Sequence, residues 1–411
     1  MKESKTTVFL NDLSIRIKRE ANLNNFHIRT TVILSLMMTF FALILGLFIH
    51  DRIRSILSSP DDTFFPQLNT HSSLSPNSHF QNDTPSNSDL LSFDLSKRRV
   101  IELGDWIAPK ELQHSMSDEE LFWRASMMPH VVEYPYNRTP KMAFMFLTKG
   151  KLPLAPLWER FFKGHQGLYS IYLHTSPDYA LEPPESSVFY KRRIPSQGVE
   201  WGKKTMVDAE RRLLANALLD FSNERFILLS ETCIPIFNFT TIYTHLINSN
   251  QSFLSLFDDP RRRGRGRYNH KMGPTISLSD WRKGSQWFEA QRRLAVEIVS
   301  DSRYYSVFVE HCNPPCYMDE HYLPTLVNKV CPDLTSNESI TWVDWSRDGP
   351  HPSTFTKRYV SEAFLNRIRH GFNCTYNGRI SSICFLFARK FHPNTLQPLL
   401  SIAPDLLGFN V

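Results

Sequence analysis

Two short segments carry the residues best suited to chemistry. Residues 387–391 (FARKF) place Arg389 and Lys390 between apolar neighbours, which would desolvate and position both cations. Residues 319–325 (DEHYLPT) place Glu320 shortly after two cysteines that could hold the backbone. Such a carboxylate can take a proton from a hydroxyl group, and paired cations can stabilise a leaving diphosphate. The simpler alternatives are a helix N-terminus with acidic residues and a solvated Lys-Arg pair.

Motifs typical of several other chemistries are absent from the sequence. It contains no GxGxxG, GxxxxGK[ST] or GxSxG pattern and no Asp-x-Asp pair. Metal-dependent sugar-nucleotide transferases often use an Asp-x-Asp pair to hold the cation. We therefore expect no metal and no cofactor, with basic side chains neutralising any diphosphate.

The most basic stretch is residues 261–267 (RRRGRGR), which alone would suggest RNA or phosphate binding. The chain as a whole has 47 basic and 41 acidic residues, a formal charge of +6. That balance does not support a field that recruits nucleic acid, and we expect no nucleic-acid partner. The stretch is interpreted as a mobile loop over a site, a binder of acidic glycans, or a solvated loop.

Alternating apolar segments predict the elements that position these residues. We expect strands at 143–148, 168–174, 225–230 and 253–257, and a helix start at 117–120. Residues 206–221 predict an amphipathic helix, with Glu210, Arg211 and Arg212 largely outside its apolar stripe. Strands separated by helices indicate an α/β sheet, whose ligands lie beyond the carboxyl ends of the strands. Those ends are polar, and Glu231 follows the third strand.

The N-terminal part predicts a membrane anchor. Residues 32–49 contain neither charge nor proline, and an 18-residue helix spans about 27 Å, close to the roughly 30 Å hydrocarbon core. A cleaved signal peptide and a core helix are the alternatives. Because six basic residues precede this segment, we expect type II topology. The predicted organisation is a cytosolic tail (1–31), an anchor (32–49), a flexible luminal stem (50–99) and a luminal head (100–411).

Cysteines and glycosylation motifs agree with an oxidising lumen. All six cysteines follow residue 49 and are disulfide candidates; a zinc site using His321 is the alternative for three of them. They are Cys233, Cys312, Cys316, Cys331, Cys374 and Cys384. Six Asn-x-Ser/Thr sequons support the same topology. They start at Asn82, Asn137, Asn238, Asn250, Asn337 and Asn373.

Four segments, in order, resemble the plant core-2/I-branching β-1,6-N-acetylglucosaminyltransferase-like proteins. They are residues 280–289 (DWRKGSQWFE), 318–325 (MDEHYLPT), 345–355 (WSRDGPHPSTF) and 387–391 (FARKF). The resemblance extends from about residue 141 to about residue 400. It implies a GT-A-like fold, a Rossmann-like mixed sheet flanked by helices, in a luminal domain behind one N-terminal transmembrane helix. It also implies a single-pass type II protein of the Golgi membrane.

The resemblance further implies inverting transfer of N-acetylglucosamine, or a related sugar such as glucuronic acid, from a UDP-sugar to a hydroxyl of a glycan or glycoprotein. Glu320 falls on the general base of the animal enzymes, although Met318 replaces a proline. Lys390 falls on a diphosphate-binding lysine, with Arg389 in place of an asparagine. We assign Glu231 to the donor side as well, and either Lys357 or Arg358 to a second basic position.

The chain departs from the animal enzymes at one further position. An Asp that precedes a Pro after the third strand in the animal enzymes is replaced by Cys233. This departure keeps a non-catalytic luminal glycan-binding or scaffold protein of the same fold as the alternative.

We expect residues 281–287 to shape the acceptor side, because tryptophan faces pack on sugar rings. The assigned positions are Trp281, Gly284, Ser285 and Trp287.

Overall fold

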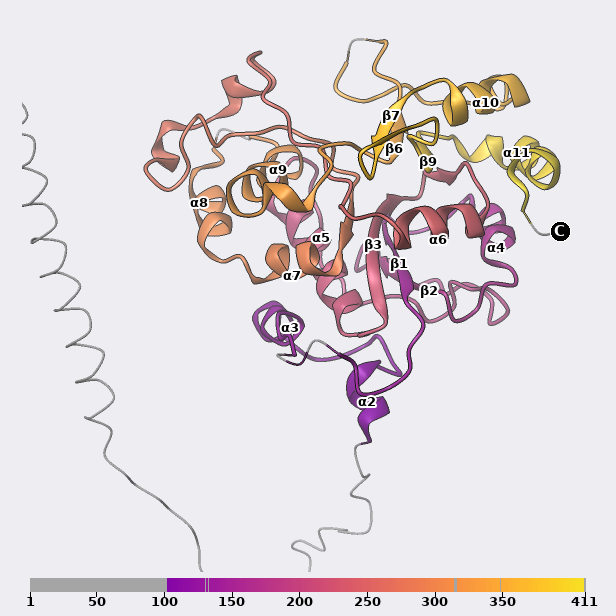
Figure 1. Cartoon of the computed structure of the whole chain (residues 1–411), viewed down its shortest axis with the longest axis horizontal. Helices are drawn as coiled ribbons and strands as arrows, with labels where there is room; N and C mark the ends of the chain where they lie inside the picture. Colours follow the sequence, from indigo (N-terminus) through magenta and orange to yellow (C-terminus); the bar gives the residue numbers. More distant parts are fainter. Residues whose placement is uncertain (1–101, 130, 132, 314–315, 348, 410–411) are drawn as a thin grey trace, which may run out of the picture. The chain divides into compact units, whose positions relative to one another are not determined.

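A four-stranded sheet in the order β2-β1-β3-β5 lies at the centre of the fold (Figure 1). The computed structural model describes residues 102–409, apart from residues 130, 132, 314–315 and 348. Strands β1 (Lys141–Leu147), β2 (Tyr169–His174) and β3 (Asn223–Ser230) are parallel, and β5 (Glu289–Gln291) is antiparallel to β3. All but the first residue of β1 are buried, which explains its unbroken apolar sequence.

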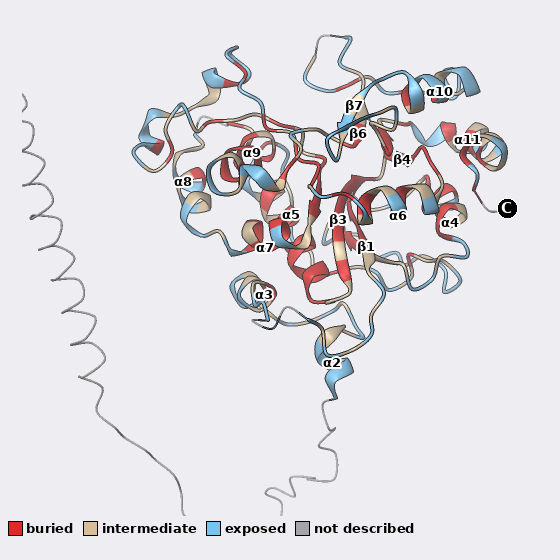
Figure 2. Ribbon diagram, viewed as in Figure 1, coloured by how far each residue is buried: buried red, intermediate tan, exposed pale blue. Residues whose placement is uncertain are grey.

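Each face of this sheet packs against its own hydrophobic core, as the buried strands in Figure 2 indicate. Ala143 and Met145 of β1 point into one core, with α5 (Lys204–Leu218) and α7 (Arg292–Ser300). Phe144 and Phe146 point into the other, with α4 (Ala155–Phe162) and α6 (Phe239–Ile247). We call these the α5 core and the α4 core. The alternation follows from the two-residue period of a strand.

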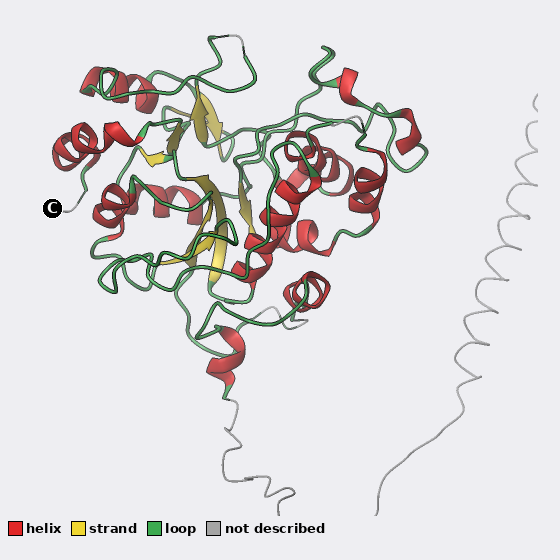
Figure 3. Cartoon of the chain, turned by 180° about the vertical axis from the view of Figure 1, so that it is seen from behind, coloured by secondary structure: helices red, strands yellow, loops and turns green. Residues whose placement is uncertain are grey.

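Smaller elements complete the described part of the chain (Figure 3). A second sheet has the order β4-β9-β6, and β7 pairs with β8 in a hairpin. The remaining strands are β4 (Ile234–Pro235), β6 (Thr341–Val343), β7 (Cys374–Tyr376), β8 (Arg379–Ser381) and β9 (Phe387–Arg389). The remaining α-helices are α2 (Leu103–Ile107), α3 (Asp118–Ala125), α8 (Arg303–His311), α9 (Met318–Val330), α10 (Glu362–His370) and α11 (Leu396–Ile402). Short helical turns are η2 (Arg265–Arg267), η3 (His270–Met272), η4 (Pro332–Leu334), η5 (Pro393–Thr395) and η6 (Ala403–Leu407).

The first three predicted strands and the helix between the second and third are present, but the fourth predicted strand is not. Residues 253–257 form only isolated bridges at Phe253 and Phe257. The backbone N–H groups of Leu254 and Leu256 instead donate to the side chains of Thr335 and Asn337, at 3.1 and 2.6 Å. Because side chains occupy these donors, the segment cannot form a continuous ladder.

The charged residues of helix α5 that lie largely outside its apolar stripe are nevertheless buried. Glu210, Arg211 and Arg212 are buried, because α3, α7 and α9 also pack against this helix. Arg212 donates to both carboxylate oxygens of Asp118, at 2.7 and 2.6 Å. Arg211 donates to the backbone carbonyl groups of Val299, in the last turn of α7, and Asp301, just after it. Hydrogen bonds of this kind offset the free-energy cost of burying two guanidinium groups.

The fold class needs one correction, which concerns the membrane. Within residues 102–409 as described, no helix is both long and apolar enough to cross a membrane. The longest helix there, α5, has 15 residues and measures about 22 Å, against a hydrocarbon core of about 30 Å. This finding overturns a fold class that includes a transmembrane helix and leaves a mixed α/β fold. The predicted tail (1–31), anchor (32–49) and stem (50–99) lie outside the described residues.

Candidate active site

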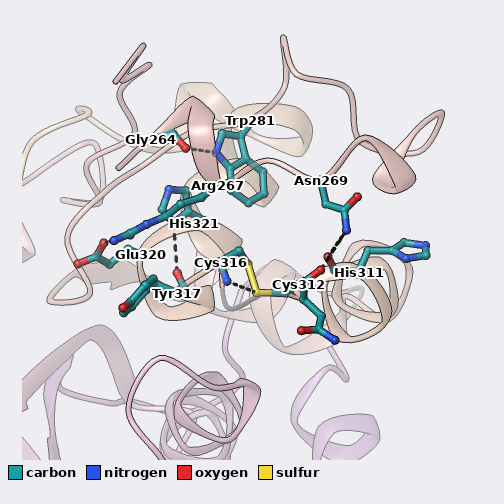
Figure 4. Close-up of a disulfide and its surroundings, with 11 residues drawn as sticks. Gly264, Arg267, Asn269, Trp281, His311, Cys312, Cys316, Tyr317, Glu320 and His321 are labelled. Carbon is teal, nitrogen blue, oxygen red and sulfur yellow. Dashed lines mark hydrogen bonds and ion pairs between the residues drawn. A yellow bond between two sulfur atoms is a disulfide. The ribbon is translucent and has the colours of Figure 1, made fainter. Parts of the chain in front are cut away.

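Glu320 lies in the first turn of α9, at a point where the chain is tightly constrained (Figure 4). Tyr317, the N-cap residue of α9, has a left-handed backbone conformation with a φ of 54°. A disulfide between Cys312 and Cys316 closes the loop just before it. The acidic first turn, Asp319 and Glu320, complements the positive end of the helix dipole. The backbone carbonyl of Glu320 also accepts the N–H of Gly284 at 2.9 Å.

Two cations contact the same oxygen of the Glu320 carboxylate. Arg267 Nη1 lies 2.8 Å from Oε2, and Lys283 Nζ contacts that oxygen as well. Burial alone would raise the pKa of Glu320, but the charges and hydrogen bonds of Lys283 and Arg267 outweigh it, and the pKa lies below its ordinary value. Glu320 is therefore an ionised carboxylate at neutral pH.

The Arg267 side chain is held in place by an aromatic ring and by a fixed loop. Its guanidinium lies over the Tyr317 ring, 4.0 Å from the ring centroid. The backbone carbonyl of Gly264, three residues earlier, accepts a hydrogen bond from Trp281 Nε1 at 3.1 Å. A β-carbon on Gly264 would lie 2.3 Å from the Asp259 carbonyl oxygen, so the loop needs glycine here. The basic stretch therefore supplies one positioned cation to the site.

The rest of that stretch faces outward. Arg261 pairs with Asp259 at 2.8 Å, and Arg265 pairs with Asp258. Arg262 and Arg263 are exposed. Arg267 places this stretch beside Glu320, and its interpretations as a mobile loop over a site, a binder of acidic glycans or a solvated loop stay predictions.

Burial favours the neutral forms of the acidic and imidazole groups near Glu320. Burial, and then the charge of Glu320, raise the pKa of Asp319 to about 6. Burial, and then Lys283, lower the pKa of His321 to about 3. Glu210 of α5 accepts a hydrogen bond from Gln286 at 2.9 Å, and burial raises its pKa well above the ordinary value. Glu320 is thus the ionised carboxylate of this cluster at acidic pH.

Arg389 and Lys390 lie together at the end of β9, the middle strand of the second sheet. The Arg389 guanidinium lies over the Trp287 ring, 4.1 Å from its centroid. Burial lowers the pKa of Arg389, while Cys233 and Glu231 act in the opposite direction. Burial and then Arg389 lower the pKa of Lys390. The structure therefore places Glu231 near the two cations.

Comparison with known proteins assigns this arrangement to a family. The model of the Core-2/I-branching enzyme family matches residues 142–369, more than half of the chain. A rice (Oryza sativa subsp. japonica) protein, Glycosyltransferase BC10, is 34% identical over 298 residues, which cover 61% of this chain and 73% of the rice protein. The chain belongs to the Core-2/I-branching enzyme family. It is accordingly an enzyme of the glycosyltransferase class, which uses a sugar donor and an acceptor.

The second basic position of this family member, assigned to Lys357 or Arg358, stays a prediction. Lys357 and Arg358 are exposed, and their segment reaches the cation pair through its backbone, where Phe355 N–H donates to the Lys390 carbonyl at 2.8 Å. His351, in the same segment, is a basic group whose pKa responds to the two cations. Burial, and then Lys390 and Arg389, lower its pKa. His351 lies within the motif at 345–355, where no feature of the sequence distinguishes it from its neighbours.

The predicted acceptor-side residues of this Core-2/I-branching enzyme differ in their surroundings, and one of them lies against the cation pair. Trp281 is 1% exposed, and its ring is nearly parallel to those of Phe308 and His321, so it offers no face to a ligand. Trp287 lies against Arg389 of the cation pair. Ser285 N–H donates to Ser255 Oγ at 3.0 Å.

Gly284 has a steric role beside Glu320. A β-carbon at this position would lie 2.0 Å from the Ser255 carbonyl oxygen and 2.7 Å from Pro324 Cγ. Only glycine allows residue 284 to approach α9 closely enough to bond the Glu320 carbonyl. The neighbour Lys283 is the important residue that the sequence did not single out.

Four of the six candidate cysteines form disulfides. Besides Cys312–Cys316, Cys374 pairs with Cys384 beside the β7-β8 hairpin. Cys233 and Cys331 are free thiols. Cys233 is fully buried, and burial raises its pKa. The described residues contain no group of three or more His, Cys, Asp or Glu that could hold a metal, so the zinc alternative for Cys312, Cys316 and Cys331 finds no support.

The sequons differ in how accessible their asparagines are. Asn238 is the N-cap of α6, where its Oδ1 accepts the Thr241 N–H at 2.8 Å, so its side chain is already engaged. Asn82 lies outside the described residues. The remaining four sequon asparagines are exposed. They are Asn137, Asn250, Asn337 and Asn373.

Proposed function

We propose that this enzyme transfers a sugar from a UDP-sugar to a hydroxyl of a glycan or glycoprotein in one displacement that inverts the anomeric configuration. N-acetylglucosamine and related sugars such as glucuronic acid are the proposed groups, and the Golgi lumen is the proposed compartment. The observation that carries the proposal is an ionised carboxylate on α9 together with a partly buried cation pair on β9.

Glu320 is the proposed general base. A base must be ionised before it can accept a proton, and Lys283 and Arg267 keep the Glu320 pKa low enough for that. Both cations contact Oε2, and we assign Oε1 to the acceptor hydroxyl. As the hydroxyl oxygen attacks the anomeric carbon, its proton moves to Glu320. The lowered pKa also makes Glu320 a weaker base. Its position and orientation relative to the acceptor hydroxyl must offset that loss of basicity.

Lys390 and Arg389 are the proposed partners of the leaving group. The bond between the anomeric carbon and the diphosphate oxygen breaks, and negative charge develops on UDP. Cations held in a partly buried site stabilise such charge more strongly than cations in water. The Arg389 guanidinium is already oriented by Trp287, so little reorganisation is needed when the charge develops. We propose that these side chains take the place of a divalent metal.

A titration of the purified protein with UDP, with and without EDTA, tests the metal-independent part. We expect the same UDP affinity under both conditions. A requirement for added Mg²⁺ or Mn²⁺ would contradict the role of Lys390 and Arg389. No UDP binding by the folded protein would favour the non-catalytic alternative. Lys390→Ala should weaken UDP binding, whereas Lys271→Ala, which removes an exposed lysine elsewhere, should not.

Substitution of the base tests the catalytic part. Glu320→Gln should reduce turnover by about 10²–10⁴-fold, measured as UDP release from a panel of UDP-sugars with glycan acceptors. Its UDP affinity should stay within a few-fold of that of the unmodified protein. Glu310→Gln on the adjacent helix α8 is the matched control, because Glu310 is exposed. A variant that loses UDP affinity yet keeps turnover would overturn the assignment.

A further inference from the structure

A row of three rings connects the surroundings of Glu320 with the cation pair. Tyr317, which lies under Arg267, has its ring centroid 5.0 Å from that of Trp201. The Trp201 centroid is in turn 4.9 Å from that of His351. These residues come from three separate parts of the chain: the loop before α5, the start of α9 and the loop after β6. None of them has a part in the proposed chemistry.

The loop that carries His351 begins and ends at the cation pair. Val343, the last residue of β6, is the register partner of Arg389 in β9. At the other end, Phe355 N–H donates to the Lys390 carbonyl at 2.8 Å. Because both ends of the loop are fixed beside these cations, His351 lies on their side of the row. Tyr317 marks the Glu320 side, and Trp201 lies between the two.

Trp201 is held in position with its ring still accessible. Its ring planes make angles of 64° and 53° with those of Tyr317 and His351, so neither neighbour stacks flat on the indole. The side chain is 48% exposed. Gly202, with a φ of +75°, packs closely on Tyr317, where a β-carbon would lie 3.2 Å from the ring. The turn is closed by Lys203 N–H donating to the Glu200 carbonyl at 3.2 Å.

We propose that Trp201 is the platform on which the sugar ring of the UDP-sugar donor stacks, with Tyr317 and His351 fixing the orientation of the indole. This inference rests on the proposed function. In a single displacement the anomeric carbon lies between the attacking oxygen and the leaving diphosphate. The donor sugar therefore occupies the space between Glu320 and the cation pair, where Trp201 lies. The electron-rich face of an indole suits the C–H groups on the apolar face of a pyranose.

Calorimetric titrations with UDP, UDP-N-acetylglucosamine and UDP-glucuronic acid test this inference on the full-length protein. At least one UDP-sugar should bind more tightly than UDP itself. Trp201→Ala should weaken binding of that UDP-sugar by about tenfold, which corresponds to about 1.4 kcal/mol, and change UDP affinity less than twofold. Trp201→Phe, which keeps an aromatic face, should recover most of the loss. Trp123→Ala is the matched control, because Trp123 is another exposed tryptophan, on α3.

The possible outcomes separate this inference from the function on which it rests. Equal losses of UDP and UDP-sugar affinity in Trp201→Ala would indicate a structural role and overturn the platform. Unchanged UDP-sugar affinity, or UDP-sugars that bind no better than UDP to the unmodified protein, would overturn it too. In all three cases UDP still binds to the unmodified protein, so the proposed function stands. A folded protein that binds no UDP would overturn both.

Discussion

At the scale of single residues, the main feature of the site is the opposition between burial and charge at Glu320. Burial raises the pKa of a carboxyl group, and a nearby cation lowers it. Around Glu320 the cations prevail, whereas at the adjacent Asp319 burial prevails. Two neighbouring carboxyl groups on one helix therefore have different charges near pH 5. The difference keeps Glu320 in the ionised form that a base needs even at acidic pH, where Asp319 is largely protonated.

Removal of one cation should raise the pKa of Glu320 and shift the pH dependence of catalysis. Lys283→Met keeps most of the side-chain volume but removes the charge that contributes most to lowering this pKa. The base is active when ionised, so its activity declines as pH falls through its pKa. We therefore expect the acidic limb of the kcat/KM profile to move to higher pH in the variant.

The matched control for this shift is Lys271→Met, which removes an exposed lysine from a neighbouring loop. Its profile should coincide with that of the unmodified protein. An acidic limb at the same pH in both variants would mean that Lys283 does not act on Glu320 in solution.

Asp319 should make folding stability decrease as pH rises. Its pKa is about 6 in the folded protein and ordinarily 3.8, so folding favours the protonated form. The unfolding free energy should therefore decline between pH 4 and pH 6, by up to about 3 kcal/mol from this group. Asp319→Asn removes the titration. Relative to the unmodified protein, the variant should be more stable at pH 7 than at pH 4.

Urea unfolding at pH 4 and pH 7 measures this difference. Asp178→Asn, at an exposed aspartate, is the control and should show no such pH dependence relative to the unmodified protein. Equal effects of Asp319→Asn at both pH values would contradict the burial of an ionisable group at this position.

Some residues of the site could be found from sequence, and others could not. Glu320, Arg389 and Lys390 occupy short segments whose composition is distinctive. The two cations that contact Glu320 are 53 and 37 residues away along the chain. Each is one basic residue among many, and only the fold brings it to the carboxylate. Local composition carries no signal for such a contact.

At the scale of elements, the prediction succeeded where burial determines the sequence. Strands β1 and β3 are covered on both faces, and their apolar runs reveal them. Residues 253–257 are equally apolar, but side chains distant in sequence take up two of their N–H groups. In helix α5, charged residues outside the apolar stripe are also buried, because further helices cover them. Neither effect can be predicted from the spacing of apolar residues within a segment.

The close contact between the 282–287 segment and α9 should be sensitive to one added methyl group. Gly284→Ala would place a β-carbon 2.0 Å from a backbone oxygen, so the segment must move away from α9. We expect a loss of about 1–3 kcal/mol of unfolding free energy and a lower kcat, because Lys283 moves with it. Thermal unfolding and UDP release measure the two effects.

Gly198→Ala is the control for this substitution, because a β-carbon there meets nothing within 4 Å. It should leave both quantities nearly unchanged. A Gly284→Ala variant with normal stability and turnover would show that the segment is less tightly fitted than its contacts indicate.

At the scale of the described molecule, the base and the cation pair belong to different hydrophobic cores. Met318 and Tyr322 anchor the start of α9 in the α5 core. Phe387 and Phe391, on either side of the cations, lie in the α4 core. The central sheet separates the two cores and so lies between the supports of the proposed base and of the proposed leaving-group site. Damage to one core should therefore affect one function more than the other.

Two matched substitutions, one in each core, test this division. Phe391→Ala and Phe308→Ala each remove a fully buried ring and should each cost about 3–5 kcal/mol of unfolding free energy. Phe391 adjoins Lys390, so its loss should weaken UDP binding. Phe308 packs on Trp281 in the α5 core, so its loss should lower kcat and leave the UDP dissociation constant nearly unchanged. Both constants are measured at a temperature where each variant is folded, with Phe372→Ala, at an exposed ring, as the control. Equal changes of UDP affinity in the two core variants would mean that the cores do not act separately.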